Sequence, residues 1–437
     1  MDFGFTLCNL PPKEILMRNR TTVAQGAAAI MFASLASCSG SRTSGETIEN
    51  SGAGCVVGAG GLCSFHPPSD PGPGGILFAA SGEVLALTGY PFPPVNMGDP
   101  AFVDGWDVHF ARLLVTVDNI RLSSNPDESP GDQSQTGPVL AKVLGPWAID
   151  LAHGDPSYLS GKGGPGEEAV PIASLSHSSA FDTNGTRYAF GFDLIEATTQ
   201  TVDGRPTMNV NVDAAGLADY QEMMQFQCSV LYVGTATFKG DPGFSGCTDP
   251  EHANWPTTVN FRLCFKSPAS YVNCQNPDND PATAFPNEEH QRGVAFKSTQ
   301  SVIAQITVHT DHPFWDSVLH DSPAHFDQFA ARVAGQDAGT TPTVTLDMTK
   351  GVDYTAYTDA LGNPINWRYC IAPPTDVHPR FTGPMAFDPQ SVPTCTNGNS
   401  GTGLCDYYDY TTYNQSTQGH LNSDGLCFVK RNYPSPP

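Results

Sequence analysis

The chain has 437 residues, 39% of them hydrophobic, so it is long enough to bury one large core or two ordinary ones. Its 43 glycines and 38 prolines exceed ordinary usage but stay below the share that signals disorder, so we expect a folded, loop-rich protein. With 21 basic and 44 acidic residues the net charge is −23, which excludes nucleic acid as a partner unless folding gathers a basic patch.

The N-terminal region has the parts of a secretory signal. Arg18 and Arg20 form a positive end, and residues 27–35 form an apolar segment shorter than the roughly 20 residues of a membrane span. The next residues, Leu35-Ala36-Ser37-Cys38, resemble the bacterial lipoprotein signal, in which diacylglycerol is attached to the cysteine. The resemblance implies lipidation of Cys38 and anchoring to a membrane, and Ser39 in place of an aspartate implies the outer membrane. The alternative is a buried N-terminal helix with a chance cysteine.

A tether is expected between this signal and the folded body. Acidic residues and a Pro-Pro pair before Met17 are unusual in a signal peptide, so we expect translation to start at Met17. We assign residues 1–37 to the signal and residues 38–75, rich in Gly, Ser and Pro, to the tether. A flexible coil of that length spans roughly 35 Å, enough to hold the body clear of the bilayer.

The body alternates apolar and polar residues in short segments bounded by Gly, Pro, Asn and Asp, which is typical of half-buried strands. Helical periodicity is limited to residues 214–224 and 324–333. We therefore predict an all-β fold, an antiparallel β-sandwich or sandwiches with long disulfide-stapled loops and a few short helices. We divide the body into residues 76–225 and 226–437, two halves that can share one core. The expected strands lie at residues 106–122, 187–198, 207–213, 257–265 and 302–308.

Cysteine usage points to an oxidising compartment. Cys8 precedes the expected start, and the ten cysteines that remain besides Cys38 indicate five disulfides in an exported chain. Thiolate metal ligation is the alternative, but the chain has no C-x-x-C pair, and the absence of C-x-x-C-H excludes covalent c-type haem. We expect local bridges 55/63, 264/274 and 395/405, with the remaining four paired in an order that the sequence leaves open. The ten are Cys55, Cys63, Cys228, Cys247, Cys264, Cys274, Cys370, Cys395, Cys405 and Cys427.

Histidines crowd one stretch of the C-terminal half. His309, Asp311 and His312 stand where an expected strand ends and a turn begins before Pro313, so two imidazoles and a carboxylate can face one ion. Imidazole is a common ligand of copper and zinc, and a carboxylate can complete the set or orient a ring. His420, in a Gly-flanked loop beside Cys427, is expected as a distant fourth ligand. The alternative is a polar turn, because H-x-D-H is not a specific motif.

Other candidate sites have weaker patterns. Residues 276–280, Asn-Pro-Asp-Asn-Asp, could hold calcium loosely, but they lack the glycine and distal glutamate of an EF-hand loop, and a solvated turn is the alternative. Ser245 lies in Gly-Phe-Ser-Gly, which is not the G-x-S-x-G of hydrolases. The tyrosines of residues 407–413 could form a sugar platform, and we interpret them as core residues of a strand.

Two segments, His309 to Ala330 and Asp406 to Arg431, resemble parts of large lipoproteins of the myxobacterial kind. That resemblance covers about the C-terminal third and implies no activity. From the residues, we expect a lipid-anchored exported protein that binds copper or zinc, for metal handling or electron-transfer support, with no assigned protein partner. The alternatives are a structural or adhesive surface lipoprotein without metal, and a metal-dependent hydrolase that uses the same histidines.

Overall fold

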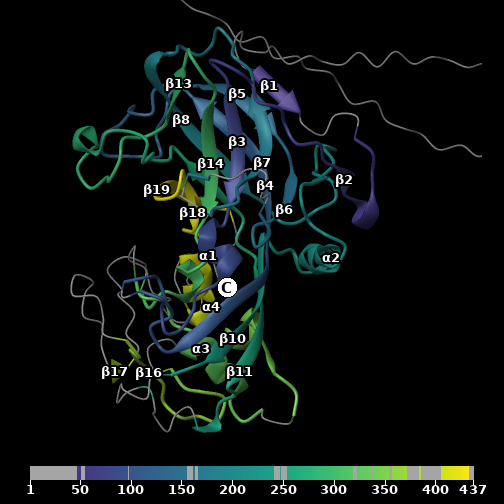
Figure 1. The fold of residues 1–437 in the computed structure, drawn as a ribbon, viewed down its shortest axis with the longest axis vertical. Coiled ribbons are helices and arrows are strands. Elements are labelled where there is room, and N and C mark those ends of the chain that lie inside the picture. The colour runs from purple at the N-terminus through teal and green to yellow at the C-terminus, as the bar shows by residue number, and fades with distance from the viewer. Residues whose placement is uncertain are drawn as a thin grey trace, which may run out of the picture. The chain divides into compact units, whose positions relative to one another are not determined.

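The longest strand, β4 (Trp106–Ser123), is the centre of the larger sheet (Figure 1). Along most of its length it pairs antiparallel with β10 (Val230–Phe238) and β6 (Trp147–Asp150), and near its end with β5 (Val139–Leu144) and β8 (Asn184–Leu194). Its large apolar side chains are buried, as the alternation of the sequence predicts. Strands from both sides of residue 225 therefore pair directly and share one core.

The remaining strands of this sheet extend it at both edges and past β8. Most pairs are antiparallel, and β1, β2, β9 and β15 join in parallel. These strands are β1 (Thr47–Asn50), β2 (Cys63–Ser64), β9 (Met208–Asn209), β11 (Thr258–Phe265), β12 (Ala269–Val272), β13 (Val294–Lys297), β15 (Thr343–Thr345) and β20 (Phe428–Arg431).

A second sheet carries the histidine region. Its strand order is β19 (Gly425–Leu426), β18 (Gly419–Leu421), β14 (Val302–Val308), β3 (Ile76–Ser81) and β7 (Val170–Leu175), with β14 and β3 parallel. Side chains of both sheets meet in one core, where the Phe78 and Phe190 ring centroids lie 6.2 Å apart. A pair of short strands, β16 (Asn366–Trp367) and β17 (Gly383–Pro384), stands apart from these sheets.

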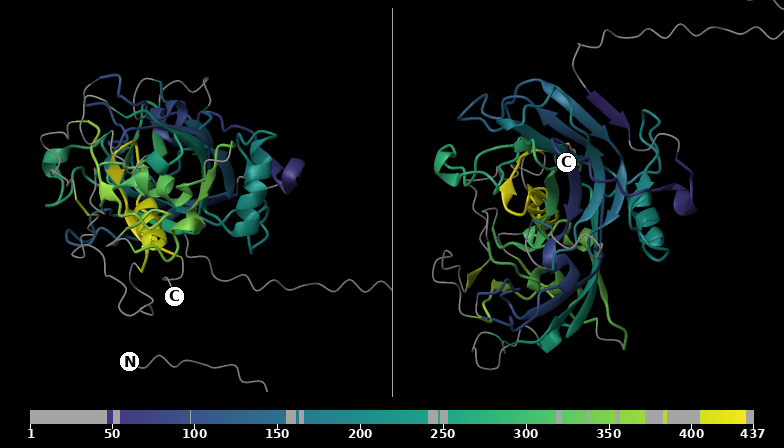
Figure 2. Two further views of the ribbon diagram at one scale, coloured as in Figure 1. Left: turned by 90° about the horizontal axis from the view of Figure 1, so that it is seen from below. Right: turned by 45° about the horizontal axis from the view of Figure 1, so that its top comes forward.

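Helices are few and short. They are α1 (Glu83–Thr88), α2 (Gly216–Phe226), α3 (Asp327–Ala330) and α4 (Tyr407–Gln415), with 3-10 turns η1 (Ala59–Gly61), η3 (Pro281–Thr283), η4 (His312–Phe314), η5 (Ala331–Val333) and η6 (Leu346–Thr349). Both helices expected from the sequence are present within a few residues. Figure 2 shows α2 beside the larger sheet and α4 among the C-terminal strands.

The tyrosine-rich segment after Asp406 is a helix, so its interpretation as a strand is wrong. The Asp406 carboxylate accepts a hydrogen bond from the backbone N–H of Asp409 at 3.0 Å, which caps the first turn. Tyr407, Tyr410, Thr411 and Asn414 are buried, which is the i, i+3, i+4, i+7 spacing of one helix face. Tyr407 and Tyr410 pack in the core, as expected for this segment, and Tyr408 and Tyr413 pack against it partly buried.

The all-β class with few short helices is confirmed, but the sheets are mixed rather than purely antiparallel. The parallel pairs join chain segments that are distant in the sequence, and alternation within a strand does not reveal such pairing. Part of the expected tether is also packed on the body. β1 and β2 pair with β5 and β9, and Leu62 and Cys63 are buried in the core, whereas Val56 and Val57 stay exposed.

The computed structural model describes residues 47–50, 55–96, 98–154, 161–162, 166–240, 247, 253–317, 322–336, 339–353, 357–371, 383–384 and 405–432. Residues 44–437 form one compact unit, and residues 1–43, which include the expected signal and Cys38, lie outside the described residues. In the described part of the chain, no helix has the length and apolar character to cross a membrane.

Four disulfides join described cysteines. Cys55–Cys63 is the expected local bridge. The expected pair 264/274 is wrong, because Cys264 in β11 bonds Cys228, which lies just before the adjacent strand β10, and Cys274 bonds Cys427. Cys247 bonds Cys370, and Cys405 is disulfide-bonded as well, while Cys395 lies outside the described residues. Three of these four bridges join cysteines that are far apart in the sequence, and together they indicate an oxidising, extracytoplasmic compartment.

Candidate metal centre

Three histidines meet where β14 ends. β14 stops at Val308, His309 follows, and His312 begins the 3-10 turn η4, in which Pro313 suits the second position. His420 lies in β18, which pairs antiparallel with β14 in a register that sets Thr307 opposite His420. The expected Gly-flanked loop around His420 is therefore a strand. Gly419 is required there, because a Cβ atom would lie 2.4 Å from the Tyr271 ring.

The three imidazoles, here called the His triad, each offer a nitrogen, and these nitrogens all lie within 4.8 Å of one another. The rings of His309 and His420 stack with centroids 4.1 Å apart, and the His312 ring stands nearly perpendicular to both at 5.3 Å. His312 and His420 are fully buried, and His309 is partly exposed. The triad could therefore bind a metal ion, and the partly exposed His309 is the ring through which the triad meets solvent.

Two of the rings are held by hydrogen bonds from the segment that carries His420. Nε2 of His309 lies 3.2 Å from the carbonyl oxygen of Ser423. Nδ1 of His312 lies 2.7 Å from Oγ1 of Thr417. Groups of this kind orient metal-ligating histidines in known metal sites and fix which nitrogen faces the ion.

Asp311 does not join the triad as a ligand. Its carboxylate accepts a hydrogen bond from the indole Nε1 of Trp315 at 3.1 Å. The Trp315 ring in turn lies against His312, with centroids 3.7 Å apart. The expected orienting role is thus indirect: Asp311 holds the indole that packs on a ligand ring. The turn of η4 takes the Asp311 side chain away from the strand face that was expected to bring it beside His309.

One carboxylate does approach the triad. Glu83, at the start of α1, lies 3.8 Å from Nε2 of His309 and accepts a hydrogen bond from the Ser423 hydroxyl at 2.7 Å. Burial raises the pKa of Glu83, and the nearby His309 opposes that rise. Burial also raises the pKa of Tyr90 and of Tyr232, with the charge of Asp311 adding to both. The surroundings of the triad are thus desolvated, which strengthens electrostatic interactions with a bound cation.

The other histidines have different surroundings. His325 is buried between Asp104 and Asp316, at 3.9 and 3.4 Å, in a network that includes Asp327 and Arg368. His109 and His153 pair with the neighbouring carboxylates Asp107 and Asp150 near the surface. His109 and His153 thus have carboxylate partners, whereas His325 belongs to a buried ionic network apart from the three histidines above.

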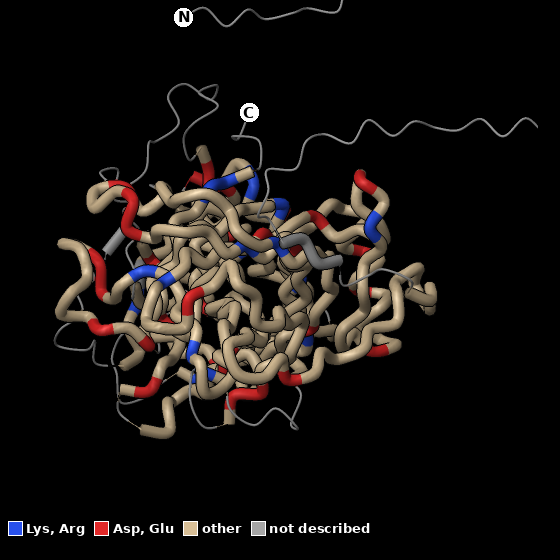
Figure 3. The backbone as a smooth tube through the Cα atoms, turned by 90° about the horizontal axis from the view of Figure 1, so that it is seen from above, with Lys and Arg blue, Asp and Glu red and all other residues tan. Residues whose placement is uncertain are grey.

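The acidic turn at residues 276–280 is occupied by local contacts. Asp278 pairs with Lys162 at 2.6 Å, and Asp280 caps η3 by accepting from the Ala282 N–H. Figure 3 shows Asp and Glu distributed widely over the described backbone, with Lys and Arg interspersed among them. In the described part of the chain, the acidic residues are therefore spread over many segments of the backbone.

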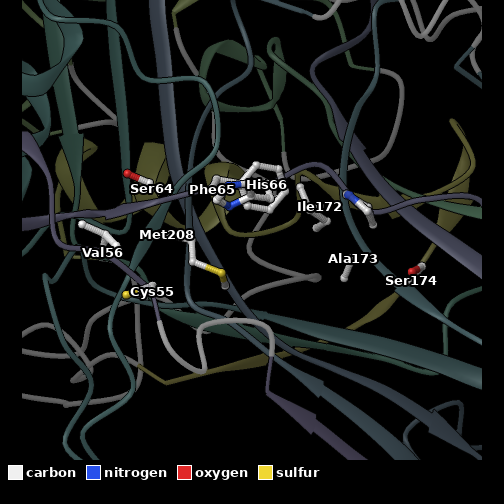
Figure 4. A pocket seen from close by; sticks show the side chains of 10 residues that line it. Cys55, Val56, Ser64, Phe65, His66, Ile172, Ala173, Ser174 and Met208 are labelled. Atoms are coloured by element: carbon white, nitrogen blue, oxygen red, sulfur yellow. The ribbon is translucent and has the colours of Figure 1, made fainter.

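A pocket of about 450 Å³ lies elsewhere, between β2, β7 and β9 (Figure 4). Its lining includes the Cys55 loop, Phe65, His66, Ile172 and Met208. None of the triad residues lines it. The hydrolase alternative, which needs an open coordination position in a cleft, gains no support from this pocket.

No family model matches the chain, and neither the curated proteins nor the solved structures include a detectable relative.

The sequence pattern predicts the three histidines but not the side chains and the carbonyl group that contact their rings. Thr417 and Ser423 flank His420 and carried no signal beyond being short polar residues. Trp315 is close in sequence to His312, yet an indole beside a histidine is no motif. Glu83 comes from a distant segment, and only the pairing of β3 with β14 brings α1 to the site.

Proposed function

We propose that this chain is an exported protein, anchored to the outer membrane through a lipid on Cys38, that binds a copper or zinc ion at the His triad. Its role would be metal handling or support of electron transfer. The observation that carries the proposal is the convergence of three imidazole nitrogens within 4.8 Å inside the fold, two of them on fully buried rings.

The chemistry of the donors supports the choice of metals. Three imidazoles without a thiolate or a carboxylate ligand suit zinc and copper, whereas calcium and magnesium prefer oxygen. Nitrogens bound to one zinc ion at about 2.0–2.1 Å lie at most about 4 Å apart, so small ring rotations close the site. A ligand from β18 beside two from the β14 end surrounds an ion better than one short segment can.

The N-terminal sequence and the disulfides both support the proposed lipid anchor. The disulfides require an oxidising environment, which an exported lipoprotein has. The resemblance of two C-terminal segments to myxobacterial lipoproteins agrees with the same location, and one of these segments contains His309 and His312.

The direct test is a calorimetric titration of the metal-free chain with Zn²⁺ and with Cu²⁺. We expect one tight site per chain, absent from the double variant His309→Ala with His312→Ala, and retained in the control His177→Ala. Equal affinity in the double variant and the parent would favour the structural alternative, in which the cluster is a polar turn. Circular dichroism of the double variant checks that the fold is intact.

A further inference from the structure

The hydrogen-bond partner of His309 decides which of its nitrogens carries the proton. Nε2 lies 3.2 Å from the Ser423 carbonyl oxygen, which can only accept. Nε2 must therefore be the N–H of the neutral ring. The lone pair is then on Nδ1, the nitrogen that can bind a metal.

The partner of His312 decides the opposite arrangement for that ring. Thr417 has a single hydroxyl proton, and it donates this proton to the carbonyl oxygen of Asn414 at 2.7 Å. Its oxygen must then accept from Nδ1–H of His312, at 2.7 Å. The His312 lone pair is consequently on Nε2.

Ser423 is held firmly enough to act as such a partner. Its backbone has φ 77° and that of the preceding Asn422 has φ 52°, a left-handed conformation that costs energy in residues other than glycine. The Ser423 N–H donates to Thr307 Oγ1 at 3.0 Å, and its hydroxyl donates to Glu83. Backbone strain maintained by contacts on several sides fixes the carbonyl toward His309.

We propose that the triad takes its ion through Nδ1 of His309 and Nε2 of His312, and that Thr417 and the Ser423 carbonyl are the positioning groups that set these tautomers. The inference rests on the proposed metal binding and adds the coordinating atoms and their support. Because the hydrogen bonds leave the lone pair of each neutral ring on the proposed donor nitrogen, binding needs no tautomer exchange. Loss of such a supporting group typically lowers metal affinity about 10–100-fold.

Nuclear magnetic resonance of the full mature chain labelled with ¹⁵N-histidine tests the tautomers directly. The metal-free chain is measured at pH 8, above the ordinary histidine pKa of about 6.5, so that the rings are neutral. We expect the Nε2–H form for His309 and the Nδ1–H form for His312. In Thr417→Val the His312 ring should lose its tautomer preference, while His309 keeps its own as an internal control.

Zinc affinity is measured on the same samples. Thr417→Val should bind Zn²⁺ about 10–100-fold more weakly than the parent, and Thr417→Ser, which restores the hydroxyl, should recover the parent affinity. Thr283→Val is the matched control, because Thr283 also donates to a carbonyl three residues earlier, that of Asp280, but in η3. It should change neither the tautomers nor the affinity.

The reverse tautomer at either ring of the parent, or parent-like zinc affinity in Thr417→Val, would overturn the inference. Failure of the parent chain to bind Zn²⁺ or Cu²⁺ at all would instead overturn the proposed function. The tautomers are read in the metal-free chain, so the two failures are told apart in one set of samples.

Discussion

The rings of His309 and His420 stack with centroids 4.1 Å apart, although they come from segments far apart in the sequence. Antiparallel pairing of β14 with β18 brings them together, and the backbone N–H of His309 continues that ladder by donating to the Gln418 carbonyl at 3.0 Å. The β18–β19 hairpin is in turn tied to the larger sheet by the Cys274–Cys427 disulfide. The geometry of the triad therefore depends on sheet register and on one disulfide.

His420→Ala should weaken the uptake of Zn²⁺ without abolishing it, because His309 and His312 remain on one short segment. Removing a ligand also leaves a small cavity at a fully buried position, so a loss of stability is expected. Isothermal titration at pH 8 gives the affinity, and thermal melting gives the stability. An affinity equal to that of the parent would show that β18 contributes no ligand.

Breaking the Cys274–Cys427 disulfide with the double change to serine should lower both stability and metal affinity. Loss of a native bridge typically costs about 2–5 kcal/mol in small secreted domains. Affinity should also fall, because the hairpin that carries His420 loses its tie. Denaturant unfolding and zinc titration measure the two effects.

The matched control is the double serine variant of Cys228 and Cys264. That bridge joins Cys228, just before β10, to Cys264 in β11, and neither cysteine lies in the β18–β19 hairpin. Its loss should reduce the stability of the fold and leave the zinc affinity unchanged. If both variants lose affinity equally, the effect comes from global destabilisation and not from the position of His420.

The buried carboxyl of Asp104 should make stability depend on pH. Burial, and then the charge of Asp327, raise the pKa of Asp104 to about 7, whereas His325 and Arg368 act in the opposite direction. The folded chain therefore keeps a proton that the unfolded chain has lost between about pH 4 and pH 7, so the free energy of unfolding contributed by this group falls as pH rises through that window.

Asp104→Asn should remove this contribution, because a neutral amide can still accept from the Phe326 and Asp327 N–H groups, now bound to Asp104 at 2.7 Å. Urea unfolding from pH 4.5 to 7.5 should show a smaller decline in the variant than in the parent. Parallel pH profiles for the two proteins would show that Asp104 is charged throughout.

Cys38→Ala should block lipidation and leave unprocessed precursor or released protein, because no thiol remains at the expected site. Mass spectrometry of the N-terminal peptide and membrane fractionation of cells are the measurements. A chain that starts at Met17 should be exported as well as the full chain and serves as the positive control. An unmodified Cys38 with unchanged fractionation would contradict the anchor.

Strand positions could be predicted because apolar alternation is a local property. Val259, Phe261, Leu263 and Phe265 are buried in β11 as the pattern requires. The Tyr407 segment was misjudged for a local reason too: tyrosine has strand propensity, and the helical spacing of its buried residues outweighs that propensity once they pack. Propensity thus gave the wrong element where packing decided it.

Partners that depend on sheet register could not be read from the sequence. Cys264 pairs with Cys228 because β10 and β11 are adjacent, and no spacing rule reveals that adjacency. The convergence of His420 with His309 and His312 could be anticipated from ligand chemistry. The contact of Asp311 with Trp315 and the approach of Glu83 to His309 could not be anticipated. Both depend on where the turn η4 and the helix α1 lie in the fold.

Elemental analysis of the chain purified without chelators measures whether the His triad holds a metal ion. We expect about one copper or zinc ion per chain in the parent and none in the double variant His309→Ala with His312→Ala, purified side by side. A parent chain that carries no transition metal, and takes up none when Zn²⁺ or Cu²⁺ is supplied, would show that the His triad is not a copper or zinc site.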